Sequence, residues 1–112
     1  MTALFYRKSA PSEYLKSVTR ALNGNYEEAL ATFGQEGGIN EVVLLLALKR
    51  NDEAWEKAQN LPETARSEYV KAIAANRLDK VMDAINHIEK AFELDPSLRD
   101  VAKVDADVMD LL

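Results

Sequence analysis

Cysteine is absent from this sequence of 112 residues, and glycine, proline, histidine and tryptophan are rare, at four, three, one and one. Without cysteine there is no disulfide framework, no thiolate nucleophile and no cysteine-ligated zinc site. No apolar run approaches the ~20 residues that cross a bilayer, and the apolar patch in the N-terminal MTALFYRKSAPSEY is shorter than a signal-peptide core. We therefore expect no membrane insertion and a cytoplasmic location for the chain as written. A periplasmic or surface location is expected if it is a fragment of a longer exported protein.

The composition is that of one soluble globular domain spanning residues 1–112, with 47% hydrophobic and 29% charged residues. The formal net charge is −5 and the pI is about 4.9, with the acidic residues spread along the chain. Such a surface repels nucleic acid and anionic membranes. Nucleic-acid binding is therefore excluded from the expected functions.

Apolar residues recur at helical spacing, and the few glycines and prolines fall between these segments, so the sequence predicts an all-α fold. We predict helical hairpins over about residues 11–33, 40–60 and 62–94, followed by one capping helix over 96–112. The last helix is predicted from an apolar stripe with steps of three, three, four and three residues, formed by Leu98, Val101, Val104, Val108 and Leu111. The run Val42–Leu48 is apolar on every side, which predicts a helix buried in the middle of the fold.

Short polar motifs mark the predicted helix boundaries. Asn40 is a plausible N-cap for the helix that follows it, and Asn51-Asp52 marks a tight turn within the second hairpin. Pro62 suits a first helical turn. Asp95-Pro96 resembles a cap followed by a first-turn proline and should open the final helix.

The three predicted hairpins share internal sequence similarity. Ser12-Glu13-Tyr14-Leu15-Lys16 recurs 55 residues later as Ser67-Glu68-Tyr69-Val70-Lys71. In the second helix of each hairpin an alanine is followed directly by a large apolar residue and, three positions later, by another apolar residue, as Ala29-Leu30 with Phe33, Ala54-Trp55 with Ala58, and Ala84-Ile85 with Ile88. Small residues at the first of these positions allow close helix approach, which predicts that the units stack.

This pattern resembles tetratricopeptide repeats. The stretch Asn25-Tyr26-Glu27-Glu28-Ala29-Leu30 with Phe33, and the stretch from Ala84 through Leu94-Asp95-Pro96, look like the second-helix half of that repeat. The spacings of 25 and 30 residues between Ala29, Ala54 and Ala84 are shorter than the family's usual 34. The resemblance covers most of residues 11–98 and implies a short right-handed superhelix of three hairpins with a C-terminal cap. It implies a non-catalytic scaffold that binds a protein or peptide.

In this family the concave face formed by the first helix of each hairpin binds the partner. The resemblance therefore implies partner contacts at Tyr14, Lys16, Arg66, Tyr69, Lys71, Asn76 and Arg77. For both tyrosines the alternative is that they pack between helices. The subclass that grips acidic chaperone tails is disfavoured, because its lysine and asparagine positions carry residues such as Tyr69 and Ile73 here.

A second hypothesis concerns context. The run over 40–108 is similar to the helical C-terminal tails of some Bacteroidetes cell-envelope proteins, including those linked to fimbria or outer-membrane assembly. This resemblance implies a structural module of a larger assembly protein. The apolar stripe of the terminal helix makes self-association through the terminal helices a further possibility.

The sequence offers little for catalysis or metal binding. His87 has Asp83 and Glu89 nearby, but one imidazole among surface carboxylates is typical of a solvated helix face. The acidic pair Asp105 and Asp107 is one of many such pairs in an acidic chain. Trp55 invites a ligand-stacking role, although its alignment with Ile85 favours core packing. We expect no enzyme activity, cofactor or metal site.

Overall fold

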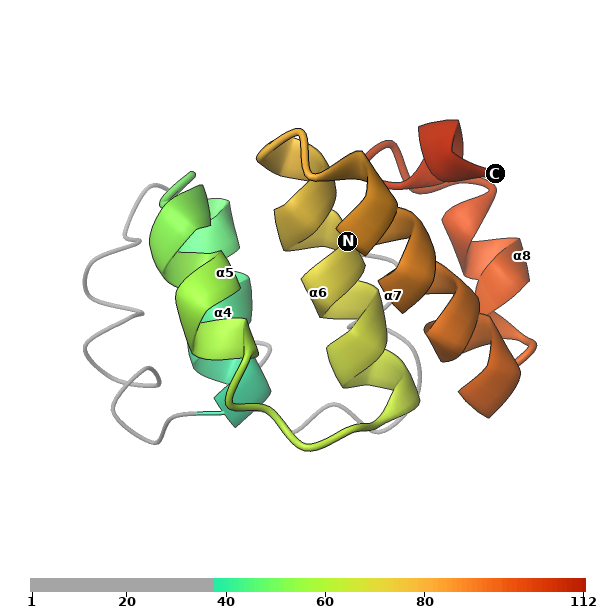
Figure 1. The fold of residues 1–112 in the computed structure, drawn as a ribbon, viewed down its shortest axis with the longest axis horizontal. Coiled ribbons are helices and arrows are strands. Elements are labelled where there is room, and N and C mark those ends of the chain that lie inside the picture. The colour runs from blue at the N-terminus through green and yellow to red at the C-terminus, as the bar shows by residue number, and fades with distance from the viewer. Residues whose placement is uncertain (1–37) are drawn as a thin grey trace.

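A computed structural model describes residues 38–112, and within this range every element is helical (Figure 1). The first described hairpin consists of α4 (Gly38–Ala47) and α5 (Asn51–Ala58), and the second of α6 (Ala65–Arg77) and α7 (Val81–Leu94). The short helix α8 (Leu98–Ala102) and the 3-10 turn η2 (Met109–Leu111) complete the chain. The predicted all-α class is confirmed for this part. The predicted hairpin over 11–33 lies outside the described residues.

In each described hairpin the two helices are joined by the same kind of turn, and the two turns lie thirty residues apart in the sequence. Lys49 and Asp79 both have positive φ, at 59° and 60°. In the first turn the amide of Arg50 donates to Leu45 O at 2.9 Å, and in the second the amide of Lys80 donates to Ala75 O, also at 2.9 Å. Each hairpin's first helix therefore ends in a Schellman motif, which satisfies its last carbonyl groups.

The core lies along α4 and α6. Five consecutive residues of α4, Val42 to Leu46, are buried, as expected for a helix that is apolar on every side. Nine consecutive residues of α6, Ser67 to Ala75, are buried as well. α6 packs against its hairpin partner α7 and against both helices of the first hairpin, which makes it the centre of the described fold (Figure 1).

Small residues permit the close packing of the second helices. Ala54 in α5 and Ala84 in α7 occupy equivalent positions and have no exposed surface. The predicted correspondence of these two alanines is consistent with the geometry, since each lies three residues after the first residue of its helix. Small side chains at this position let a helix approach its neighbour closely.

Several predicted helix starts need correction. α4 begins at Gly38, which has φ of 71°, so Asn40 lies inside the helix rather than capping it. α5 begins at Asn51, and the turn before it is formed by Leu48, Lys49 and Arg50. α6 begins at Ala65, later than the prediction from Pro62, because the Thr64 hydroxyl accepts from the amide of Ser67 at 3.1 Å and caps the helix there.

The prediction of one continuous helix over 96–112 is wrong. Asp95 is the C-cap of α7, and its carboxylate accepts from the Ser97 amide at 3.1 Å. α8 then ends after Ala102, and the chain turns before η2. Val104, which the apolar stripe placed on the buried face, is 77% exposed, whereas Val108 is fully buried. The interruption coincides with Asp105, whose side chain faces inward and accepts a hydrogen bond from the buried Tyr69 hydroxyl.

Candidate functional site

Two of the seven predicted partner-contact residues, Tyr14 and Lys16, lie outside the described residues. The other five, Arg66, Tyr69, Lys71, Asn76 and Arg77, all belong to α6. Arg66 is exposed in the first turn, but Tyr69 and Lys71 are buried and Asn76 and Arg77 are half-buried. α6 therefore holds these four side chains largely within the fold. The polar atoms of Tyr69, Asn76 and Arg77 contact other parts of the chain, whereas Lys71 pairs with Glu68 of the same helix.

Tyr69 packs between helices, which is the second of the two alternatives that the sequence left open. It has no exposed surface, and its hydroxyl donates to Asp105 Oδ2 at 2.8 Å. Burial, together with the hydrogen bond to Asp105 and the negative charge of that carboxylate, raises the pKa of the Tyr69 phenol. The phenol therefore remains a neutral donor, and it holds Asp105 in place 36 residues away along the chain.

Asp105 also shapes the backbone of the C-terminal segment. Its Oδ1 atom accepts from the amide of Asp107 at 3.0 Å, an Asx-type turn. This turn directs the Asp107 side chain toward Arg77. The acidic pair that the sequence presented as one of many is thus part of a specific network.

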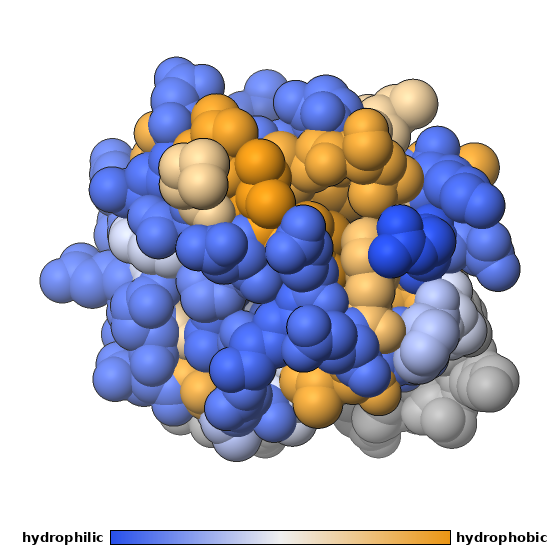
Figure 2. Space-filling view, turned by 45° about the vertical axis from the view of Figure 1, so that its right-hand side comes forward, coloured by the Kyte–Doolittle hydropathy of each residue, from blue (hydrophilic) through white to orange (hydrophobic). Residues whose placement is uncertain are grey.

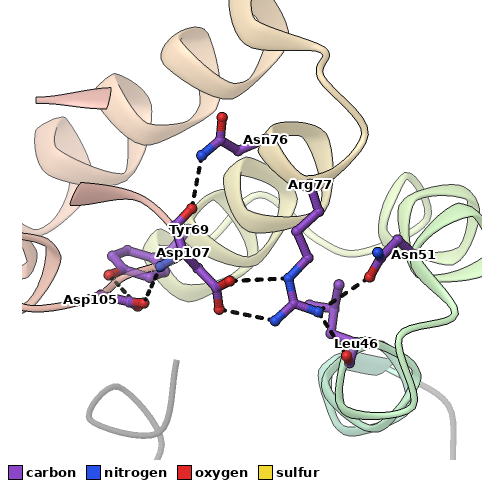
Figure 3. A network of polar contacts seen from close by, with 7 residues as sticks. All are labelled: Leu46, Asn51, Tyr69, Asn76, Arg77, Asp105 and Asp107. Carbon is purple, nitrogen blue, oxygen red and sulfur yellow. Dashed lines mark hydrogen bonds and ion pairs between the residues drawn. The ribbon is translucent and has the colours of Figure 1, made fainter. Parts of the chain in front are cut away.

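Arg77 joins three separate parts of the structure (Figure 3). Its Nε and Nη2 atoms donate to the two carboxylate oxygens of Asp107, at 3.1 and 3.0 Å. Its Nη1 atom donates to Leu46 O at 2.7 Å and to Asn51 Oδ1 at 3.2 Å. One guanidinium therefore links the end of α4, the start of α5 and the C-terminal segment. Its planar fork suits this bidentate arrangement.

Asn76 extends the same network by one residue. Its Nδ2 atom donates to Asp107 O and to Asp110 Oδ1, both at 2.9 Å. The C-terminal segment is therefore fastened to the last turn of α6 by side-chain hydrogen bonds. The sequence carried one signal of this arrangement, because the low helix propensity of Asp105 and Asp107 weakens the predicted terminal helix.

A second polar cluster lies on the other side of α6. Glu68 is buried, its Oε1 is 3.1 Å from His87 Nδ1, and its Oε2 is 3.0 Å from Lys71 Nζ. The Trp55 ring meets the His87 ring edge-on, at 5.8 Å between centroids. Burial acts to raise the pKa of Glu68, but the hydrogen bonds and charges of Lys71 and His87 outweigh it and lower that pKa.

This cluster explains the surroundings of His87 and Trp55. His87 contacts one carboxylate, that of Glu68, and residues 38–112 contain no group of three side chains able to hold a metal ion. Trp55 is half-buried and packs against the hydrophobic core. Sequence reasoning missed Glu68 as a structural residue, although a glutamate occupies this position in both copies of the repeated Ser-Glu-Tyr motif, as Glu13 and Glu68.

Apolar side chains gather on the surface over the start of α7 and the C-terminal residues, as Figure 2 shows across the upper part of that face. Val81 and Met82 are exposed in the first turn of α7, and Met109 and Leu112 are exposed in and beside η2. Met82, at 70% exposed, is the most exposed of these four. We refer to these four residues as the α7–η2 surface.

The hydrogen bonds of Asn76 place both parts of the α7–η2 surface at the same end of the molecule. They tie Asp107 and Asp110, on either side of Met109, to the last turn of α6. The turn Leu78–Lys80 leads from there directly to Val81. Figure 1 likewise places η2 at the end of the molecule where α7 begins.

No family model, curated protein or solved structure that was compared with the chain matches it. Within residues 38–112, no helix combines the length and the apolar character needed to cross a membrane.

Proposed function

We propose that this protein is a non-catalytic interaction module of the tetratricopeptide-repeat-like type, which binds a protein or peptide partner on the surface of its stacked hairpins. The proposal rests on one observation: α4–α5 and α6–α7 share the same turn at Lys49 and Asp79 and pack side by side through α6. Stacked units of one plan create extended surfaces, and such surfaces serve binding more often than catalysis.

The surface of the described residues supports a binding role in a different place from the one that the resemblance implied. Five of the ten residues of α4 and nine of the 13 residues of α6 are buried. The exposed apolar residues instead lie mainly on α7 and the C-terminal segment. Clustered exposed apolar side chains on a soluble domain mark interaction sites. We therefore place the contact on these outer elements.

Cross-linking in a lysate of the native organism tests this function. The tagged wild-type protein should give a saturable cross-linked product, identified by mass spectrometry, that an excess of untagged protein displaces. A Tyr69→Ala variant serves as the control, because removing this buried side chain costs about 3–5 kcal/mol and unfolds much of the domain. A product that does not saturate, or that forms equally with Tyr69→Ala, would contradict the proposal.

A further inference from the structure

The α7–η2 surface consists of exposed apolar side chains, and the charged residues beside them are mainly acidic. Asp79 and Asp83 flank Val81 and Met82, and Asp110 follows Met109; all three acidic residues are exposed. Lys80 is the one basic residue among residues 79–83 and 107–112. The whole chain carries a formal charge of −5, so its long-range field has the same sign as these acidic residues.

These features determine which partner fits. Apolar anchors surrounded by acidic groups complement a helix that has an apolar face and basic residues beside it. Met82 and Met109 are unbranched and flexible, so they adapt to the side chains of such a helix. A second copy of this chain fits less well, because its own α7–η2 surface would bring aspartates against aspartates.

We propose that the α7–η2 surface is a docking site for a basic amphipathic helix of a partner protein. This inference rests on the proposed binding function and names its surface and the chemistry of its partner. The apolar face of the partner helix covers Val81, Met82, Met109 and Leu112. Its lysine or arginine side chains lie opposite Asp79, Asp83 and Asp110.

The test uses the whole protein and a defined probe, an 18-residue peptide with leucines on one helical face and lysines beside them. Two control peptides are used, one with every lysine replaced by glutamate and one of scrambled order. Titrations followed by 1H–15N spectra and calorimetry should show binding of the lysine peptide, with shifts concentrated in residues 79–85 and 107–112. Both control peptides should bind at least tenfold more weakly.

Matched variants separate the apolar contribution from the charge. The double variant Met82→Ser with Met109→Ser should weaken binding at least tenfold, whereas Leu94→Ser should change it less than twofold. Leu94 is the proper control, because it is a similarly exposed apolar residue, 51% exposed, at the opposite end of α7. All three side chains are at least half exposed, so these variants should keep the wild-type fold.

Charge variants complete the test. Asp83→Lys should weaken binding by about threefold to tenfold and flatten its dependence on salt, as expected for exposed charges. Glu56→Lys makes the same change on the exposed face of α5 and should have no effect. Equal binding of the glutamate peptide, or shifts centred elsewhere, would overturn the proposal.

Self-association is a separate outcome that would also overturn it. Sedimentation that shows a dimer of the wild-type protein, dissociated by Met82→Ser, would assign the surface to a second copy. The two proposals fail independently, because cross-linking to a native partner through another face would leave the binding function intact. In that case only the assignment of the α7–η2 surface would be wrong.

Discussion

Replacement of Arg77 by methionine tests the network that holds the C-terminal segment. The variant keeps an unbranched apolar stem but removes the guanidinium and its four hydrogen bonds, two to Asp107 and one each to Leu46 O and Asn51 Oδ1. We expect the end of α4, the start of α5 and the C-terminal segment to lose their common link.

The magnitude follows from the surroundings of the guanidinium. The Arg77 and Asp107 side chains are each 24% exposed, so water screens part of their attraction. Leu46 O keeps a second donor, the amide of Lys49 at 3.0 Å, and therefore stays satisfied. We expect a loss of about 2 kcal/mol in the free energy of unfolding, below the ~3–5 kcal/mol of a fully buried pair. In a domain of this size, that lowers Tm by about 10 °C.

Urea unfolding followed by circular dichroism measures this loss, with Arg66→Met as the matched control. Arg66 lies on the same helix but is exposed, so its variant should stay within about 0.5 kcal/mol of wild type. Combination with Asp107→Asn in a double-mutant cycle should give a coupling of at least about 1 kcal/mol. If Arg77→Met and Arg66→Met unfold alike, the network does not stabilise the fold and the reasoning is refuted.

Three further predictions concern other elements. Tyr69→Phe removes the buried hydrogen bond to Asp105 and should cost about 2 kcal/mol in urea unfolding, with faster hydrogen exchange in residues 103–108; unchanged exchange would count against the tie. Lys49→Gly should raise stability by about 0.5–1 kcal/mol, because glycine relieves the positive φ of 59°, and a loss of stability would show that the turn is unstrained. The contribution of Glu68 should depend on pH. Since its folded pKa lies below the ordinary 4.5, its ion pairs stabilise the protein above that pH and stop doing so as the pH falls through the lowered value. The difference in unfolding free energy between wild type and Glu68→Gln should therefore shrink below about pH 4, and a constant difference from pH 7 to pH 3 would contradict it.

Part of the site could be inferred from sequence and part could not. The repeated Ser-Glu-Tyr motif singled out Tyr69, and its packing between helices was one of two stated alternatives. The motif did not reveal that Glu68 is buried with Lys71, because a glutamate and a lysine three residues apart look the same on an exposed helix face. Burial of both depends on the helices that surround α6.

The C-terminal segment shows the same limit. The steps between Leu98, Val101, Val104 and Val108 fit a helix. Such local periodicity carries no information about hydrogen-bond partners that are distant in the sequence. Asp105 lies within that stripe, yet its carboxylate binds a tyrosine 36 residues away. A buried carboxylate needs such partners, and the helix is interrupted close to the point where Asp105 turns inward to reach one.

The sequence by itself determined the helical class, the second described hairpin and the equivalence of Ala54 and Ala84, because these depend on spacing within one or two turns of a helix. Only the tertiary structure decided which polar groups face inward and where apolar side chains remain exposed. Arg77 reaches Leu46, Asn51 and Asp107 over separations of 26 to 31 residues. Those contacts exist only after the hairpins have packed.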